Sequence, residues 1–272
     1  IAKPLAEGSN SISKRYFPPQ IKTYINYDPS IIHSINHEND KEIIAQKNKQ
    51  GKVGGLGDEI VFLNPKIIVR QAGAKLCATY FERELYLDYS LFSISNKNSS
   101  VDNSKIPLLL TLAIINSKLL NYYAWEMNII EHQKGGTPQI RIKGLRSLPV
   151  PKEIPNSIEQ KLINLSMNII EEAKRIDLII SKFNNLICNK FEANDNFDLL
   201  GGHNILEYFK LHKIKLSLSE ESEWMQYFNE QKQRAEELKI KIDKTDREID
   251  HMVYELYGLT EQEINIVEEA TA

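Results

Sequence analysis

The chain has 272 residues, of which 42% are hydrophobic and 26% are charged, so a largely disordered protein is excluded and two domains are expected. Cys77 and Cys188 lie too far apart for a disulfide framework, and no secretion signal or bilayer-length apolar run is recognisable, so we expect a cytoplasmic protein without a membrane partner. Residues 1–150 hold 19 of the 34 Lys and Arg and 13 of the 37 Asp and Glu, a net charge of +6, which leaves −9 for residues 151–272. Since an acidic half repels phosphate, any nucleic-acid surface is expected in the first half, although uneven solvated charge alone gives the same numbers.

Short β-type runs fill the first half of the chain, and Gly, Pro, Asn and Asp divide them. One strongly apolar helix is expected at about residues 106–127, and because it is apolar on nearly all sides it should be buried. Residues 1–151 are therefore expected to form a β-rich domain with a buried helix. The expected strands are residues 24–27, 59–63, 66–70, 85–89 and 139–142.

Helical periodicity dominates residues 152–272. Apolar residues recur at spacings of three, four or seven, first from Ile158 to Ile187 and then from Trp224 to Leu256, which is close to the heptad repeat of a coiled coil. Ser157 and Gln160 have the spacing of a capping box for the first of these helices. A long antiparallel helical hairpin is therefore predicted, with a short helix near residues 205–211 in its connection, and the fold class is α+β.

The end of the chain carries a clear helix stop and restart. Gly258 is the residue type that closes a helix in the left-handed conformation. Thr260 with Glu263 has the spacing of a capping box, which predicts a short C-terminal helix directly after the long one.

No catalytic, cofactor or metal site is expected in this chain. An adenine-N6 methyltransferase needs Asn or Asp, then Pro-Pro and an aromatic residue, but Pro18-Pro19 is preceded by Phe17 and followed by Gln20. The other candidates lack the spacing of a cofactor loop, a zinc pair or a nuclease centre. They are residues 51–57, His33 with His37, and Asp58 and Glu59 with Lys66.

Several short motifs follow one another in a recognisable order. They are Pro-Lys-Ile at residues 65–67, Ala-Thr-Tyr at 78–80, Asn-Ser-Lys at 116–118, Lys-Gly-Gly at 134–136, Leu-Pro-Val-Pro at 148–151, Ile-Asp at 249–250, Val-Tyr-Glu-Leu-Tyr-Gly-Leu at 253–259, and Thr-x-x-Glu-Ile at 260–264. This order resembles the TaqI-like C-terminal specificity domain, the target recognition domain of adenine-N6 DNA methyltransferases of the type IIG restriction-modification kind. The resemblance covers about residues 1–190 and 235–270.

The resemblance implies a module that recognises double-stranded DNA and positions it for a methyltransferase domain of the same polypeptide. That domain would bind S-adenosylmethionine, and Mg²⁺ would be needed where a nuclease accompanies it. Because the first residue is Ile rather than Met, we expect a fragment of a longer protein. The resemblance implies a role of that protein in restriction or another phage defence, and we expect a monomer. The helical hairpin would brace the recognition domain or dock it on the catalytic domain.

A DNA-reading surface needs Arg, Lys, Gln and Thr side chains over a rigid core. The segment 134–146 is the first candidate, and Gln139, Arg141 and Lys143 would share one face of a strand. A charged edge strand that prevents aggregation has the same composition. The candidate DNA-binding residues are Lys134, Thr137, Gln139, Arg141, Lys143 and Arg146, followed by Arg70, Gln71 and Lys75.

Two other functions are compatible with this sequence. In a protein-interaction scaffold, the acidic hairpin would bind a partner through an exposed apolar seam, and DNA binding would be absent. A complete small nuclease would need a carboxylate cluster that the sequence does not offer. The hairpin could equally be a plain stabilising element that contacts nothing else.

Overall fold

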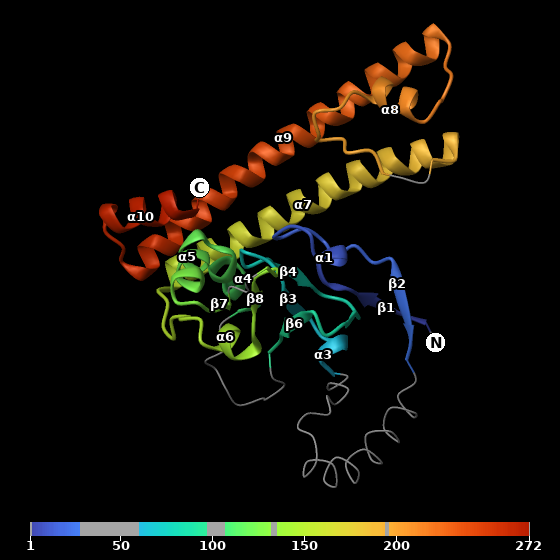
Figure 1. Cartoon of the computed structure of the whole chain (residues 1–272). Helices are drawn as coiled ribbons and strands as arrows, with labels where there is room; N and C mark the ends of the chain where they lie inside the picture. Colours follow the sequence, from blue (N-terminus) through green and yellow to red (C-terminus); the bar gives the residue numbers. More distant parts are fainter. Residues whose placement is uncertain (1, 28–59, 97–106, 132–134, 194–195, 272) are drawn as a thin grey trace. The chain divides into compact units, whose positions relative to one another are not determined.

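The computed structural model describes residues 2–27, 60–96, 107–131, 135–193 and 196–271 (Figure 1). The chain divides into two compact units. Unit 1 takes residues 1–15, 19–116 and 120–152, and unit 2 takes residues 16–18, 117–119 and 153–272. Small sheets in unit 1 and long helices in unit 2 confirm the α+β class.

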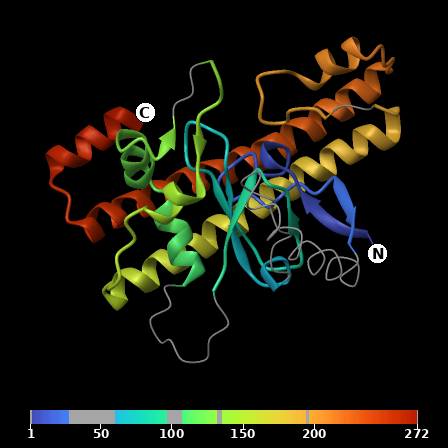
Figure 2. The same cartoon turned by 60° about the horizontal axis from the view of Figure 1, so that its bottom comes forward.

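Two three-stranded sheets and a two-stranded ribbon form the framework of unit 1 (Figure 2). In the first sheet, β1 pairs antiparallel with β2 and parallel with β5, and in the second sheet β3 pairs antiparallel with both β4 and β6. Strands overlap the predicted runs 24–27, 66–70, 85–89 and 139–142. The strands are β1 (Ala2–Ala6), β2 (Thr23–Asn26), β3 (Lys66–Arg70), β4 (Ala78–Phe81), β5 (Tyr86–Leu87), β6 (Leu91–Ile94), β7 (Ile130–Glu131) and β8 (Gln139–Ile140).

The strand predicted at residues 59–63 is wrong. Residue 59 lies outside the described residues, and Ile60–Leu63 form the short helix α3. The carbonyl oxygen of Phe62 accepts hydrogen bonds from the Leu85 amide and from the Lys66 ammonium, both at 3.0 Å. A run of four apolar residues fits a helical turn as well as a strand. The choice between helix and strand here depends on tertiary hydrogen bonds such as that from Leu85, which the local sequence does not reveal.

Lys66 is fully buried at the start of β3. Its Nζ donates hydrogen bonds to the carbonyl oxygens of Phe62 and Arg83, each at 3.0 Å. Burial lowers the pKa of Lys66 from 10.5 to about 8, and the charge of Glu84 opposes this shift. The side chain thus holds α3 to the sheet while it carries a charge that its surroundings disfavour.

This lowered pKa predicts a pH-dependent stability. Between pH 8 and 10.5 the unfolded chain binds more protons at Lys66 than the folded chain, so the contribution of Lys66 to the unfolding free energy rises with pH. We expect the wild type to gain stability relative to Lys66→Met from pH 8 to 10, measured by urea unfolding. Parallel pH profiles of the two proteins would contradict the assignment.

The single helix predicted at residues 106–127 is two helices. They are α4 (Leu108–Asn116), which is largely buried as predicted, and α5 (Lys118–Glu126). The fully buried Asn116 ends α4 and pairs with the main chain of Ala78 in β4 through two hydrogen bonds of 3.0 Å. Asn121 of α5 accepts a hydrogen bond from the Leu76 amide at 2.6 Å. Because the helix breaks at residue 117, the side chains of Asn116 and Asn121 both form hydrogen bonds with the main chain of residues 76–78.

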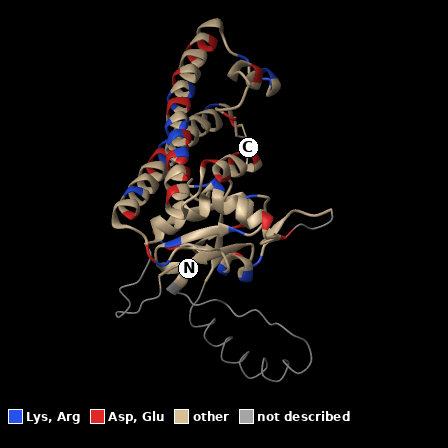
Figure 3. Cartoon of the chain, turned by 90° about the vertical axis from the view of Figure 1, so that its left-hand side faces the viewer, with Lys and Arg blue, Asp and Glu red and all other residues tan. Residues whose placement is uncertain are grey.

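Two long antiparallel helices, α7 (Asn156–Phe191) and α9 (Leu218–Tyr257), lie side by side in unit 2, so the predicted hairpin is confirmed (Figures 1 and 2). The predicted apolar stripe of α7 includes the buried residues Ile169 and Phe183. In α9 the buried residues Trp224 and Ile249 belong to the predicted stripe, and Phe228 is buried as well. Acidic and basic residues are interspersed along both helices (Figure 3).

The end of the hairpin where α7 connects to α9 contains a core of aromatic side chains. The ring of Phe183 lies 5.7 Å from that of Tyr227, 5.8 Å from Phe197 and 6.2 Å from Phe228, measured between centroids. The short helix α8 (Ile205–Leu211) packs in this core at its predicted position. This end of unit 2 therefore has a hydrophobic core of its own.

Side-chain caps fix most of the helix starts in unit 2. Capping boxes at Asn204–Glu207 and Ser217–Glu220 begin α8 and α9. The box predicted at Ser157–Gln160 is wrong, because α7 begins at Asn156 after Pro155, which has no side-chain cap. Pro155 instead accepts the first amides of the helix with its main-chain carbonyl.

The predicted stop and restart at the C-terminus are confirmed. Gly258 ends α9 in the left-handed conformation with φ 67°. The helix α10 (Glu261–Thr271) then begins with a capping box, in which the Thr260 amide donates to Glu263 at 2.8 Å and the Glu263 amide donates to Thr260 at 3.4 Å.

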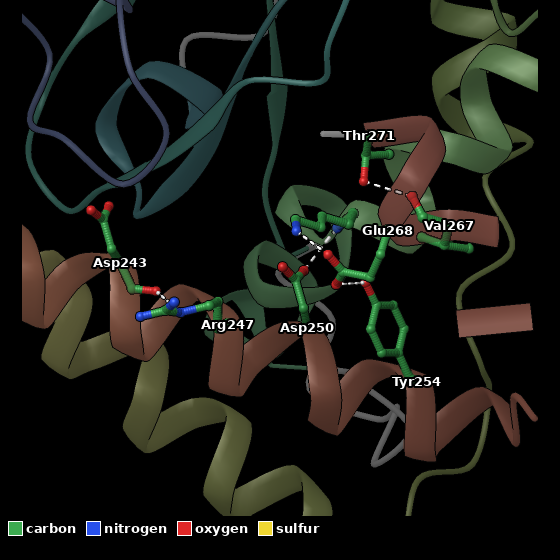
Figure 4. Close-up of polar contacts among 8 residues, drawn as sticks. Asp243, Arg247, Asp250, Tyr254, Val267, Glu268 and Thr271 are labelled. Atoms are coloured by element: carbon green, nitrogen blue, oxygen red, sulfur yellow. Dashed lines mark hydrogen bonds and ion pairs between the residues drawn. The ribbon is translucent and has the colours of Figure 1, made fainter. Parts of the chain in front are cut away.

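A polar network connects α9, α10 and residues 117–119 within unit 2 (Figure 4). The buried Asp250 accepts a hydrogen bond of 2.8 Å from the main-chain amide of Lys118. Glu268 forms an ion pair with the Lys118 ammonium and accepts a hydrogen bond of 2.8 Å from the Tyr254 hydroxyl. Burial, followed by the hydrogen bond to Glu268, raises the pKa of Tyr254. Asp250 of the tail thus contacts Lys118 of the Asn-Ser-Lys motif directly, whereas Tyr254 is linked to Lys118 through Glu268.

Candidate nucleic-acid interface

The two candidate DNA-binding segments lie next to each other in unit 1. The loop after β3 and the chain before α6 form an antiparallel bridge between Ala72 and Gln139. The Ile140 amide donates to the Gln71 carbonyl at 2.9 Å, and the Gly73 amide donates to the Pro138 carbonyl at 2.8 Å. These main-chain bonds combine the segments 71–73 and 137–140 into one surface, which we call the bridge surface.

The polar side chains of this surface differ in exposure. Thr137 is exposed, whereas Gln71 and Gln139 are half-buried. Lys75 is exposed at the far end of the loop that follows Arg70. A rigid backbone that presents a hydroxyl and two amide side chains has the groups that read base edges.

Arg70 is directed into the domain and supports the loop. Its Nη1 donates to the Ile12 carbonyl at 3.3 Å, and its amide donates to the Cys77 carbonyl at 3.0 Å. Gly73 has φ +146°, and a Cβ there would lie only 2.7 Å from Arg70 Nη2. The guanidinium therefore packs tightly beneath the loop that carries Gln71.

The expectation that Gln139, Arg141 and Lys143 share one strand face is wrong. The strand β8 ends at Ile140, and α6 (Ile142–Arg146) begins two residues later with Arg141 in its N-cap position. Because the period of the backbone changes from two residues to about 3.6, the side chains cannot continue on one face. The prediction failed because three alternating polar residues are too few to distinguish the period of a strand from that of a helix.

The basic residues around α6 therefore have separate surroundings. Arg141 is exposed and forms an ion pair with Glu131 of β7, with Nε and Oε2 3.1 Å apart. Lys143 is exposed on α6. Arg146 lines a cavity of about 860 Å³ together with Ser93 and Thr111. Lys134 lies outside the described residues.

The turn between β5 and β6 also borders the bridge surface, and it is not among the candidate segments predicted from the sequence. The Gln71 amide donates to the Ser90 carbonyl at 3.0 Å, so this turn joins the bridge surface on its other side. The sequence Asp88-Tyr89-Ser90 could have revealed it, because Asp followed by Ser two residues later is typical of a side-chain-stabilised turn.

The earlier candidates for other chemistry divide into two groups. Residues 51–57, His33, His37, Asp58 and Glu59 lie outside the described residues. Lys66 is described, and its ammonium is buried against carbonyl oxygens. Among the described residues, no group of three or more His, Cys, Asp or Glu side chains could hold a metal ion. In the same part of the chain, no helix has the length and apolar character needed to cross a membrane.

Comparison with known families identifies the class of this protein. The model of the TaqI-like C-terminal specificity domain matches residues 3–150, which is more than half of the chain. The chain therefore belongs to the TaqI-like C-terminal specificity domain family, as the sequence motifs predicted. It carries a DNA-recognition domain of the kind used in restriction-modification systems, and such specificity domains are not themselves catalytic.

Two further results complete the comparison. Residues 155–253, which include α7, α8 and most of α9, match a family described only as a domain of unknown function, DUF8810. No curated protein matches the chain. The family match therefore assigns a class to unit 1 and leaves the hairpin without an assigned role.

Proposed function

We propose that this chain is the DNA-specificity part of an adenine-N6 DNA methyltransferase of the type IIG restriction-modification kind. The observation that carries the proposal is the bridge surface, in a chain that belongs to a family of specificity domains. The methyltransferase domain, with its S-adenosylmethionine site, belongs to another part of the same polypeptide. Mg²⁺ is required where that polypeptide also cleaves DNA.

Each side chain around the bridge surface has a role in this proposal. Gln71 and Gln139 present amides, which can pair with the adenine N6 and N7 atoms in the major groove. Thr137 contacts a base edge or the sugar-phosphate backbone. The remaining charged candidates supply positive charge for phosphate oxygens, whereas Arg70 is directed into the domain and supports the loop. These charged candidates are Lys75, Lys134, Arg141, Lys143 and Arg146.

The direct test is binding of the chain to a fluorescein-labelled random-sequence duplex at low salt, measured by fluorescence anisotropy over a salt series. We expect the double variant Arg141→Ala/Lys143→Ala to bind about tenfold more weakly. The slope of log affinity against log salt should fall by up to about two, because each lost phosphate contact contributes about 0.9.

A matched control comes from unit 2. Lys239 lies 3.9 Å from Asp243 and is exposed, and Lys241 is exposed nearby, so Lys239→Ala/Lys241→Ala also removes one ion-paired and one further exposed cation. The control should bind as tightly as the wild type. Equal losses in both double variants would assign the effect to net charge and not to the proposed surface.

For the hairpin we propose a role in bracing the specificity domain or docking it on the catalytic domain. Several apolar side chains of the long helices are exposed, which supports contact with a protein surface. They include Met167, Leu178, Leu186 and Ile240. A protein-interaction scaffold also accounts for these side chains, but it predicts no salt-dependent DNA binding, so the duplex experiment separates the two functions.

A further inference from the structure

Tyr89 occupies a turn that is fixed from several sides. The turn between β5 and β6 is closed by a hydrogen bond of 3.3 Å from the Leu91 amide to the Asp88 carbonyl. The Asp88 carboxylate accepts hydrogen bonds from the Ser90 amide at 3.0 Å and from the Ser90 hydroxyl at 2.5 Å. The Asp88 amide donates to the Ala6 carbonyl of β1 at 3.1 Å. The backbone on both sides of Tyr89 is therefore held in place.

The ring of Tyr89 is nevertheless left in solvent, with 93% of the residue exposed. Three positions earlier, Tyr86 is buried and its ring stacks on Phe62 at a centroid distance of 4.9 Å. Tyr86 thus accounts for the core packing of this segment. A large aromatic ring that is presented by a rigid turn, at little conformational cost, is typical of residues that contact a partner.

The turn adjoins the bridge surface directly. Its Ser90 carbonyl accepts the Gln71 amide at 3.0 Å, and the Gln71 carbonyl accepts the Ile140 amide at 2.9 Å. The main chain of Gln71 is therefore bonded on one side to the turn of Tyr89 and on the other side to the segment of Gln139. A duplex that contacts the two glutamines would meet this exposed ring at the edge of the same surface.

We propose that Tyr89 contacts the DNA through its ring, which packs against a nucleobase beside the positions that the bridge surface contacts. This inference rests on the proposed function. Aromatic rings pack on the faces of unstacked bases, and apolar side chains insert between base steps in several DNA-binding proteins. The ring itself, and not the hydroxyl, makes the contact, so the partner is a nucleobase and not a phosphate.

The experiment uses the random-sequence duplex and the salt series described above. Tyr89→Ala is expected to weaken binding about tenfold, the effect of losing one base–aromatic contact. Tyr89→Phe should bind like the wild type. Because the ring carries no charge, the loss should be the same at every salt concentration, which distinguishes it from the reduced slope of Arg141→Ala/Lys143→Ala.

Tyr24→Ala is the matched control. Tyr24 is 62% exposed on β2, at the opposite edge of the sheet that contains β5, so the same substitution removes an exposed ring elsewhere in unit 1. The control should leave binding unchanged, and none of the three variants should alter the thermal unfolding midpoint.

The outcomes separate this inference from the proposed function. Wild-type binding with an unaffected Tyr89→Ala variant overturns the role of Tyr89 alone. A loss in Tyr89→Phe equal to that in Tyr89→Ala also overturns it, because the hydroxyl would then make the contact. If the wild type does not bind duplex DNA at all, the proposed function and the role of Tyr89 both fail.

Discussion

Asn116→Ala is expected to destabilise unit 1 by about 2–4 kcal/mol. The substitution removes the side chain that donates to the Ala78 carbonyl and accepts from the Ala78 amide, each at 3.0 Å. Both main-chain groups lie at a buried residue, and each buried polar group left without a partner costs about 1–3 kcal/mol. The cavity left by the side chain adds to this loss.

The measurement is hydrogen exchange of the β4 peptide segment together with urea unfolding. Asn116→Asp keeps an acceptor for the Ala78 amide but loses the donor to the Ala78 carbonyl. We therefore expect this variant to destabilise unit 1 as well. Asn156→Ala, the same change at an exposed position in the first turn of α7, should have almost no effect. Unchanged protection of β4 in Asn116→Ala would show that its side-chain pairing does not stabilise the sheet.

Phe183→Ala is expected to destabilise unit 2 by about 3–5 kcal/mol, the usual cost of removing a buried aromatic ring. Phe183 is fully buried and its ring contacts four other aromatic rings, among them that of Trp224 at 6.4 Å. Phe183→Leu should cost less because it keeps much of the buried volume. The truncation leaves a cavity in the core that joins α7, α8 and α9.

The two tryptophans allow the effect to be assigned to one unit. In a Trp125→Phe background, Trp224 is the sole tryptophan and reports on the core that surrounds Phe183. Urea unfolding followed by its fluorescence should show the lower midpoint in Phe183→Ala. Leu178→Ala, which truncates an exposed apolar residue of the same helix, is the control and should cost less than about 1 kcal/mol. Equal losses of stability in Phe183→Ala and Leu178→Ala would contradict the proposed contribution of Phe183 to the core of unit 2.

Local chemistry determined several elements and could be read from the sequence. Gly258 has one favourable conformation at a helix end, and the Thr260–Glu263 box acts within four residues, so the end of α9 and the start of α10 were predictable. The periodicity from Ile158 to Ile187 is long enough to define a helix and its buried face. The boxes at residues 204–207 and 217–220 carry the same kind of signal and were missed.

Elements that depend on distant partners could not be predicted in this way. The break after Asn116 depends on main-chain groups of Ala78, which lies 38 residues earlier. The same limit applies to the candidate site. The segments of Gln71 and Gln139 were both identified, but their pairing is a tertiary contact without a local signal. The inward direction of Arg70 likewise depends on Ile12, which is 58 residues away.

The contacts of Lys118 constrain how target specificity is exchanged between members of this family. Unit 2 is not a continuous stretch of sequence, because residues 117–119 belong to it. A recombination event at residues 149–151 would separate Lys118 from Asp250 and Glu268, which it contacts through its amide and its ammonium. A hybrid with an uncharged residue at position 118 would keep the main-chain amide that donates to Asp250, but Glu268 would lose the ammonium with which it pairs. Natural exchange of target specificity in this family should therefore preserve the ion pair between positions 118 and 268 or replace both residues together.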